Sequence, residues 1–202
     1  AYVGEIRNEL QKLGIEENTL LIFTSDNGPH IEGGADPAFF ANKQTLRDTK
    51  RSLYEGGIRV PTIMEWCGTI SAGVKSEFPS AFWDFMPTFV HLTHQQKTWK
   101  QKTDGISILP TLTGKSRQQP HKYLYWEFHE EGGRQAVRVG DWKLIKQKIK
   151  SGNPTFELYN LKNDPFEKRD LSAENPERVR KLKKRMDKAH TPSEMFTLAI
   201  DK

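Results

Sequence analysis

The first residues of the chain carry a helical spacing of apolar positions. Within residues 2–13 the apolar residues recur every three or four positions, as on one face of a helix: Val3, Ile6, Leu10 and Leu13. Gly14 occupies the place just past the expected helix end. Residues 19–23 then form a continuous apolar run, which predicts a strand buried on both faces of a parallel sheet. This order of helix, loop and buried strand is half of an α/β unit.

A long polar segment separates this strand from the next. Residues 25–59 are rich in Gly, Asp, Asn and Lys, and loops of this length in a compact domain are usually functional or disordered. Ligands of α/β sheets bind beyond the carboxyl ends of the strands, so we expect function in the residues that follow Phe23. Residues 61–66 predict the next strand. Residues 82–92 predict a helix whose buried stripe is formed by Phe82, Phe85, Phe89 and Leu92.

Beyond the polar stretch at residues 114–119 the pattern changes to the alternation typical of strands. Four strands are expected, over residues 123–129, 135–139, 142–145 and 156–161. Gly140-Asp141 is a hairpin signal between the second and the third, and Asn175 before Pro176 predicts a capped helix start. We therefore expect an α/β domain over residues 1–115 and a small antiparallel sheet with one helix over residues 116–202.

Composition limits the class of protein. Of the 202 residues, 35% are apolar, below the roughly 45–50% of typical globular proteins, which is enough for one ordinary core and thin for two. The 10% aromatic residues argue against disorder. No apolar run approaches the ~18–20 residues of a membrane span, so we do not expect a membrane partner or an integral membrane protein.

Charge, cysteine content and the first residues narrow the class further. The net charge of +5 admits a polyanionic partner, but the basic run at residues 178–185 has an apolar stripe and no interleaved aromatic residue. A solvated helix face explains this run better than contact with nucleic acid. Cys67 is the only cysteine, which excludes an internal disulfide and a multi-thiolate zinc site. Residues 1–5 show no signal peptide, and the chain begins without Met inside a helical pattern, as expected of a cut within a longer protein.

The first candidate site follows the expected buried strand. Asp26-Asn27-Gly28 reads either as a turn, because Asn-Gly is a strong turn dipeptide, or as part of a Ca²⁺ or Mg²⁺ site built from a carboxylate and an amide oxygen. The position at the carboxyl end of a strand makes the two readings nearly equal. His30, four residues after Asp26, is either a contact to substrate or a loop His without function.

The second candidate site combines Lys50 with Glu55-Gly56-Gly57. These residues are either a solvated charge and a tight turn, or a cation for a tetrahedral anion with glycines that let the backbone approach closely. Neither motif alone distinguishes a ligand site from a turn. The two motifs in this order, about two dozen residues apart, form a specific pattern.

These motifs resemble the type I sulfatases of the arylsulfatase A-like group, in the alkaline-phosphatase superfamily. The specific part is the run Phe23-Thr24-Ser25-Asp26-Asn27-Gly28-Pro29-His30, followed by Lys50 and Tyr54-Glu55-Gly56-Gly57-Ile58-Arg59-Val60-Pro61. Further similar segments are Phe82-Trp83-Asp84-Phe85-Met86-Pro87-Thr88, Asp104-Gly105-Ile106-Ser107, and Glu157-Leu158-Tyr159-Asn160-Leu161 before Asp164-Pro165. The resemblance covers nearly the whole chain and points to the carboxy-terminal portion of such an enzyme.

The resemblance implies a fold, a chemistry and a set of site residues. The fold is the end of an alkaline-phosphatase-like α/β sulfatase domain followed by a small antiparallel sheet and helix. Asp26 and Asn27 would be metal ligands for Ca²⁺, and Lys50 would contact the sulfate as a catalytic and substrate-binding residue. The substrate would be a sulfated carbohydrate or an aryl sulfate, and the protein periplasmic or secreted. The nucleophile of the family is a formylglycine made from Cys or Ser in a Cys/Ser-x-Pro-x-Arg motif.

One departure from the family pattern is large. The chain contains no Cys/Ser-x-Pro-x-Arg, and Cys67 is followed by Gly68-Thr69-Ile70. We therefore expect only part of an active site, without turnover or tight Ca²⁺ binding by the chain alone, since Ca²⁺ prefers about six to eight oxygen ligands.

Two other functions stay open at this point. One is a phosphatase, phosphodiesterase or phosphonate hydrolase of the same superfamily, and the other is a non-catalytic polyanion-binding module. If residues 19–23 lack part of their sheet, we also expect that surface to pair with another chain, to rearrange or to aggregate. A homo-oligomer formed through the exposed sheet edge is one of these outcomes.

Overall fold

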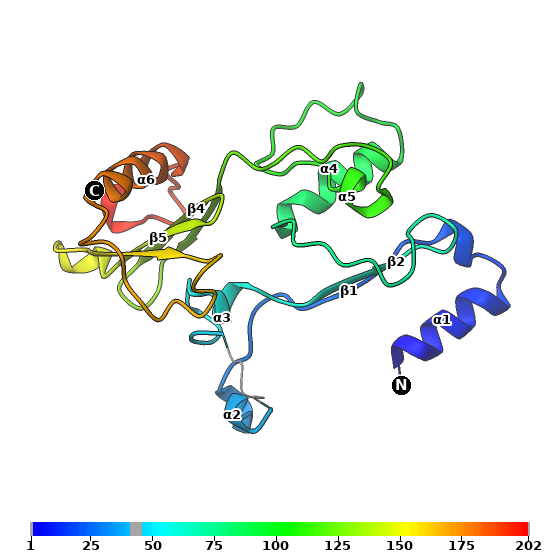
Figure 1. The fold of residues 1–202 in the computed structure, drawn as a ribbon, viewed down its shortest axis with the longest axis horizontal. Coiled ribbons are helices and arrows are strands. Elements are labelled where there is room, and N and C mark those ends of the chain that lie inside the picture. Colours follow the sequence, from blue (N-terminus) through cyan, green and yellow to red (C-terminus); the bar gives the residue numbers. More distant parts are fainter. Residues whose placement is uncertain (1, 41–45, 202) are drawn as a thin grey trace. The chain divides into compact units, whose positions relative to one another are not determined.

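The computed structural model describes residues 2–40 and 46–201 of the chain. The chain forms two compact units (Figure 1). One contains residues 1–24 and 61–120, and the other contains residues 25–60 and 121–202. The long polar segment after the first strand therefore belongs to the same unit as the carboxy-terminal residues.

The first unit begins with α1 (Tyr2–Lys12), the short 3-10 turn η1 (Glu16–Asn18) and β1 (Leu21–Thr24). The expected helix is confirmed, but the parallel sheet is wrong. β1 pairs antiparallel with β2 (Thr62–Glu65) in a two-stranded sheet, with Phe23 opposite Ile63. A short apolar run fits either pairing, because periodicity reports burial and not strand direction.

Apolar side chains of this unit remain at the surface. Phe23 is 49% exposed and its cross-strand neighbour Ile63 is 63% exposed, so β1 is not buried on both faces. α1 buries none of its residues. Its apolar stripe includes Val3 and Ile6, both exposed. Adjacent exposed apolar side chains of this kind commonly mark a surface that another element covers.

The rest of the first unit contains η3 (Phe82–Asp84), α4 (Phe85–Leu92) and α5 (Leu109–Thr113). The helix at residues 82–92 is confirmed, but its expected buried stripe is wrong, since Phe82 is 46% and Phe89 41% exposed. The buried residues are Asp84, Pro87 and Thr88 instead. The Asp84 carboxylate accepts from the Ala81 and Ile106 amides, and the Thr88 hydroxyl accepts from the Ile108 amide. These buried amides need partners, and a hydrophobic pattern does not report them.

The second unit is built around an antiparallel sheet in the order β3-β4-β5-β6. All four expected strands are confirmed: β3 (Leu124–Phe128), β4 (Arg134–Val139), β5 (Trp142–Gln147) and β6 (Thr155–Asn160). Gly140 has φ 57° in the β4–β5 hairpin, the left-handed conformation that glycine adopts without steric cost. The short helices of this unit are η2 (Glu32–Gly34), α2 (Pro37–Phe40), α3 (Glu55–Ile58), η4 (Ile149–Ser151) and η5 (Ala199–Asp201).

Both faces of this sheet are covered. On one face Leu144 packs with Leu182 and Met186 of α6 (Pro176–Ala189), and on the other Ile145 packs with Leu53 and Tyr54. Figure 1 shows α6 and α3 on the two sides of the sheet. The segment that carries the second sequence motif is therefore one of the two layers that complete this core.

The start of α6 differs from the expectation in one detail. Asn175 precedes the helix as predicted, but its side chain does not cap it. The Asn175 amide nitrogen instead donates to the Leu171 carbonyl at 3.0 Å. The side chain therefore closes the preceding turn, a competing local bond that Asn commonly makes.

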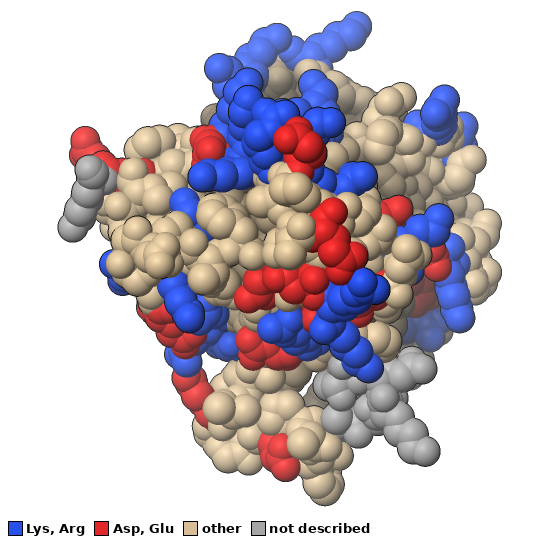
Figure 2. Space-filling model, turned by 60° about the vertical axis from the view of Figure 1, so that its left-hand side comes forward, with Lys and Arg blue, Asp and Glu red and all other residues tan. Residues whose placement is uncertain are grey.

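Basic side chains gather over α6, which carries seven Lys and Arg and two acidic residues; Figure 2 shows their patch at the top of that view. Three of them lie over aromatic rings of the sheet layer: Arg178 over Trp142, Lys183 over Phe156 and Arg185 over Tyr123. The cationic groups of these exposed side chains thus lie over the ring faces, the arrangement of cation–π contacts. In the part of the chain that the structure describes, no helix is long and apolar enough to cross a membrane.

Candidate functional site

The loop after β1 presents the Asp26-Asn27 pair. The Ser25 hydroxyl donates to the Asn27 carbonyl at 2.8 Å, and the Asn27 amide nitrogen donates to the Gly28 carbonyl at 2.8 Å. With its nitrogen engaged, the Asn27 side chain keeps its oxygen for another partner. Asp26 is exposed, whereas Gly28 is buried. Gly28 thus anchors the loop in the protein interior, while Asp26 and Asn27 carry the side-chain oxygens that could bind a ligand.

Backbone hydrogen bonds bring this loop to the second motif. The Gly28 N–H donates to the Gly57 carbonyl at 2.9 Å, and the Lys50 N–H donates to the Pro29 carbonyl at 2.8 Å. The Gly56 N–H donates to the Arg47 carbonyl at 2.8 Å and so closes the segment that carries Lys50. The two motifs that the sequence separates therefore lie side by side in one unit.

Glycine is required at three positions because backbone groups approach too closely for a side chain. A Cβ on Gly28 would lie 1.8 Å from the Gly56 carbonyl oxygen. A Cβ on Gly56 would lie 2.2 Å from the Asp48 carbonyl oxygen, and one on Gly57 2.2 Å from that of Ser52. The backbone approaches closely at these glycines, but the approach is between protein segments, and the binding of an anion stays a prediction.

Lys50 lies between two residues with unusual backbone geometry. Asp48 has φ 67° and Arg51 φ 73°, a left-handed conformation that costs non-glycine residues energy and tends to persist where surrounding contacts enforce it. The Arg51 carbonyl accepts from the Arg134 guanidinium of β4 at 2.7 Å. The tight conformation around Lys50 is thus held from outside the loop. The Lys50 side chain itself is half-buried.

His30 lies beside a charged pair. Its Nδ1 accepts from the Glu32 N–H at 2.9 Å, and the Glu32 carboxylate forms a short ion pair with Arg51. The hydrogen bond from Arg51, followed by its positive charge, lowers the pKa of Glu32. The structure therefore places His30 in the same loop cluster as Asp26 and Lys50, with one ring nitrogen engaged by the backbone.

Asp26 and Asn27 offer oxygen donors of the kind that Ca²⁺ prefers. Among residues 2–40 and 46–201, no group of three or more His, Cys, Asp or Glu side chains is arranged to hold a metal ion. A Ca²⁺ site of about six to eight oxygens would need donors beyond Asp26 and Asn27. The donor chemistry thus fits one part of a Ca²⁺ site.

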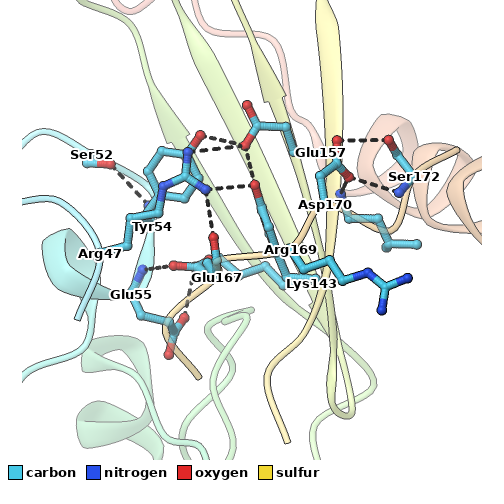
Figure 3. A network of polar contacts seen from close by, with 12 residues as sticks. Arg47, Ser52, Tyr54, Glu55, Lys143, Glu157, Glu167, Arg169, Asp170 and Ser172 are labelled. Carbon is cyan, nitrogen blue, oxygen red and sulfur yellow. Dashed lines mark hydrogen bonds and ion pairs between the residues drawn. The ribbon is translucent and has the colours of Figure 1, made fainter. Parts of the chain in front are cut away.

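A buried charged network lies behind the second motif, and the sequence did not reveal it (Figure 3). Lys143 Nζ of β5 contacts Glu55 Oε1 at 2.8 Å and Glu167 Oε1 at 2.9 Å. The side chains of Lys143 and Glu167 are fully buried and that of Glu55 is 4% exposed. Charged residues usually indicate surface in a sequence, and these three are too far apart along the chain for any spacing rule.

Arg47 joins this network to a third carboxylate, that of Glu157. Its guanidinium donates to the Tyr159 hydroxyl and to the Glu167 carbonyl, both at 2.8 Å, and stacks 3.8 Å from the centre of the Tyr54 ring. Both tyrosine hydroxyls donate to Glu157, at 2.5 and 2.6 Å. Burial, with the hydrogen bond to Glu157, raises the pKa of Tyr54 to about 12. The motif segment is therefore tied to β6 by hydrogen bonds as well as by packing.

The chain is similar to sulfatases over most of its length. Residues 1–95 match the family described as Sulfatase. The chain is 32% identical over 206 residues to the N-acetylgalactosamine-6-O-sulfatase of Bacteroides thetaiotaomicron, covering 94% of this chain and 40% of that protein. It is 35% identical over 147 residues to the N-acetylgalactosamine-6-sulfatase of Mus musculus, covering 70% of this chain and 26% of that protein.

Solved structures show the same similarity. The crystal structure of Ps i-CgsB in complex with k-i-k-neocarrahexaose matches with a TM-score of 0.76 and 29% identity, over 92% of this chain and 39% of that one. The structure of BT4656 in complex with its substrate D-glucosamine-2-N,6-O-disulfate matches with a TM-score of 0.72 and 25% identity, over 93% and 37%. The chain spans about 40% of the length of the Bacteroides relative and 26% of that of the mouse relative. The protein belongs to the sulfatase family.

Proposed function

We propose that the Asp26 loop and the Lys50 segment form part of a sulfatase active site, in a polypeptide that hydrolyses sulfate esters on a carbohydrate. The observation that carries this proposal is the pair of hydrogen bonds that joins the two segments, Gly28 to Gly57 and Lys50 to Pro29. Relatives support the substrate class. The similar bacterial and mouse proteins are N-acetylgalactosamine-6-sulfatases, and a similar structure holds a disulfated glucosamine as its substrate.

The residues of this chain would bind and neutralise the sulfate group. Asp26 and Asn27 would hold Ca²⁺ through their side-chain oxygens, and the bound ion supplies charge neutralisation and orientation of the sulfate oxygens. Lys50 would place a compact positive charge on the same group. Fixed charges aimed at a group that becomes more negative in the transition state are a major source of rate enhancement.

The nucleophile would come from outside this sequence. The 202 residues contain no Cys/Ser-x-Pro-x-Arg, so the formylglycine of the family would derive from a Cys or Ser elsewhere in a longer polypeptide. His30, near Glu32 and Arg51, would contact the substrate through the ring nitrogen that the Glu32 amide leaves free. A periplasmic or secreted location would give such an enzyme access to sulfated glycans or aryl sulfates.

The experiment uses the full reading frame that encodes this chain, purified and assayed on N-acetylgalactosamine-6-sulfate and on the matching 6-phosphate. We expect sulfate release that requires Ca²⁺, and little phosphate release. Asp26→Ala should raise the Ca²⁺ concentration needed for half-maximal activity, whereas Asp36→Ala, at a carboxylate in the same long loop, should not. Faster phosphate release would favour a phosphatase of the same superfamily. Binding of sulfated glycans without turnover would favour a non-catalytic module.

A further inference from the structure

The buried residue Glu167 accepts hydrogen bonds from both ends of the segment that carries Lys50. The Glu167 carbonyl accepts from Arg47, and the Glu167 carboxylate accepts from the Glu55 N–H at 2.6 Å (Figure 3). We propose that Glu167, together with Lys143, is a positioning residue that holds the Lys50 segment in its site geometry. This inference rests on the proposed function of Lys50.

The buried carboxylates of Glu55 and Glu167 share the ammonium group of Lys143. The Arg47 guanidinium lies against the Glu167 carbonyl. Burial raises the pKa of Glu167, and the Lys143 charge opposes that shift. A buried charge is tolerated when opposite charges and hydrogen bonds compensate it, so the loss of one member leaves the others uncompensated. The cluster therefore fixes its members relative to one another.

The backbone of Glu167 is adapted to this double contact. Its φ is 53°, a left-handed conformation at a fully buried non-glycine residue. Its N–H donates to the Asp164 carbonyl at 3.2 Å, in the turn that follows β6. In this conformation the carbonyl accepts from Arg47 while the carboxylate accepts from the Glu55 N–H. Such strain persists only when the surrounding contacts enforce it.

The contacts reach Lys50 through the backbone. Arg47 precedes Lys50 by three residues and Glu55 follows it by five, and the bond from the Gly56 N–H to the Arg47 carbonyl closes the loop between them. A segment held at both ends has fewer conformations to lose when it binds a ligand. The turn after β6 thereby contributes to the geometry of the motif without touching the substrate.

Residue-resolved amide hydrogen exchange on this chain tests the positioning role directly. In Glu167→Gln we expect the Gly28, Lys50 and Gly56 amides to exchange about tenfold faster or more, because local opening of the loop is favoured. Amides of the β4–β5 ladder should keep their rates. Glu194→Gln, which makes the same change at an exposed carboxylate, should alter neither set. Equal acceleration of loop and ladder, or no acceleration of the loop, would overturn the proposal.

One further variant and an activity measurement keep the test decisive. If Glu167→Gln does not fold, Glu167→Asp retains the charge on a shorter side chain and is expected to accelerate the loop amides less, with the ladder again unchanged. In the full reading frame, Glu167→Gln should lower kcat/KM for the sulfate ester by about tenfold, as expected of a misplaced group, and Glu167→Asp should recover part of the loss. Absence of sulfatase activity in the unmodified enzyme would overturn the proposed function, whereas the exchange pattern decides the positioning role independently.

Discussion

The Gly28 N–H donates to the Gly57 carbonyl at 2.9 Å, and this bond joins the Asp-Asn-Gly loop to the Glu-Gly-Gly helix. A side chain on either residue would collide with backbone within 2.2 Å. The glycines of both motifs are therefore explained by backbone packing. The close contact is what brings Asp26 and Asn27 toward the segment of Lys50.

Replacement of Gly28 by Ala should be costly although its backbone conformation suits any residue. The added Cβ would lie 1.8 Å from the Gly56 carbonyl oxygen, which is backbone and cannot move alone. We expect a loss of about 1–3 kcal/mol in the free energy of unfolding, the usual cost of overpacking, measured by urea denaturation.

Gly4→Ala is the control for this prediction. Gly4 lies in α1 with no atom near its added Cβ, so Ala should be neutral or stabilise by about 0.5–1 kcal/mol through helix propensity. Equal effects of the two substitutions would contradict the packing explanation.

Lys143→Met should destabilise the protein strongly. The substitution leaves the buried carboxylates of Glu55 and Glu167 without their cation, and breaking a buried pair in this way costs about 3–5 kcal/mol. Lys146 lies on the same strand, and burial lowers its pKa. Lys146→Met removes a desolvated charge and should change stability by less than about 1 kcal/mol or increase it. A similar loss in both variants would argue against a special role of the cluster.

His190 should make the stability of the second unit depend on pH. Burial opposes its protonation, but hydrogen bonds to the Glu127 and Asp201 carboxylates, both at 2.5 Å, outweigh burial and raise the pKa of His190. Because the folded pKa lies above the unfolded value near 6.5, the stabilisation is fully present below about pH 6.5 and is lost as the pH rises through the folded pKa.

The measurement compares the unfolding free energy of the unmodified protein with that of His190→Gln. The difference should be larger at about pH 5.5 than at about pH 8.5. The comparison stays above about pH 5, where Asp201, whose pKa its bond to His190 lowers, remains ionised. If the difference in unfolding free energy instead grew with pH, it would contradict a raised pKa of His190.

The exposed apolar pair on the two-stranded sheet should promote self-association. Phe23 and Ile63 are cross-strand neighbours and both are exposed, and unprotected strand edges with apolar neighbours tend to pair. We expect the 202-residue chain to sediment above its monomer mass at high concentration. The Phe23→Lys and Ile63→Lys double variant should shift it toward the monomer. A monodisperse unmodified monomer would contradict this expectation.

Much of the second unit was predictable because its signals are local. Alternation along residues 123–129 and the turn at Gly140-Asp141 predict antiparallel strands, and β3, β4 and the hairpin confirm them. The pairing of β1 was not predictable, because its short apolar run carries no information on strand direction. The predicted burial of the stripe that includes Phe82 was wrong for a different reason. The Ile106 amide needs a partner, and the Asp84 carboxylate provides it from a buried position.

The motifs of the candidate site were predictable from the sequence, but the buried residues that hold them in place were not. Asp26 and Lys50 could be selected from residue type and order, and the structure brings their segments together. Their roles toward Ca²⁺ and sulfate stay predictions. Glu167 and Lys143 could not be selected, since their burial depends on how the turn after β6 meets α3. Such contacts between distant segments leave no spacing in the sequence.

The most direct test of the proposed function is the effect of Lys50→Ala on sulfate-ester hydrolysis by the full reading frame. We expect kcat/KM for N-acetylgalactosamine-6-sulfate to fall by about 10²–10³, as when a preorganised charge is removed from a transition state. Lys75→Ala, which removes the same charge from an exposed loop, should leave kcat/KM unchanged. An active enzyme that tolerates Lys50→Ala as well as Lys75→Ala would contradict the assignment of this segment to the sulfate site.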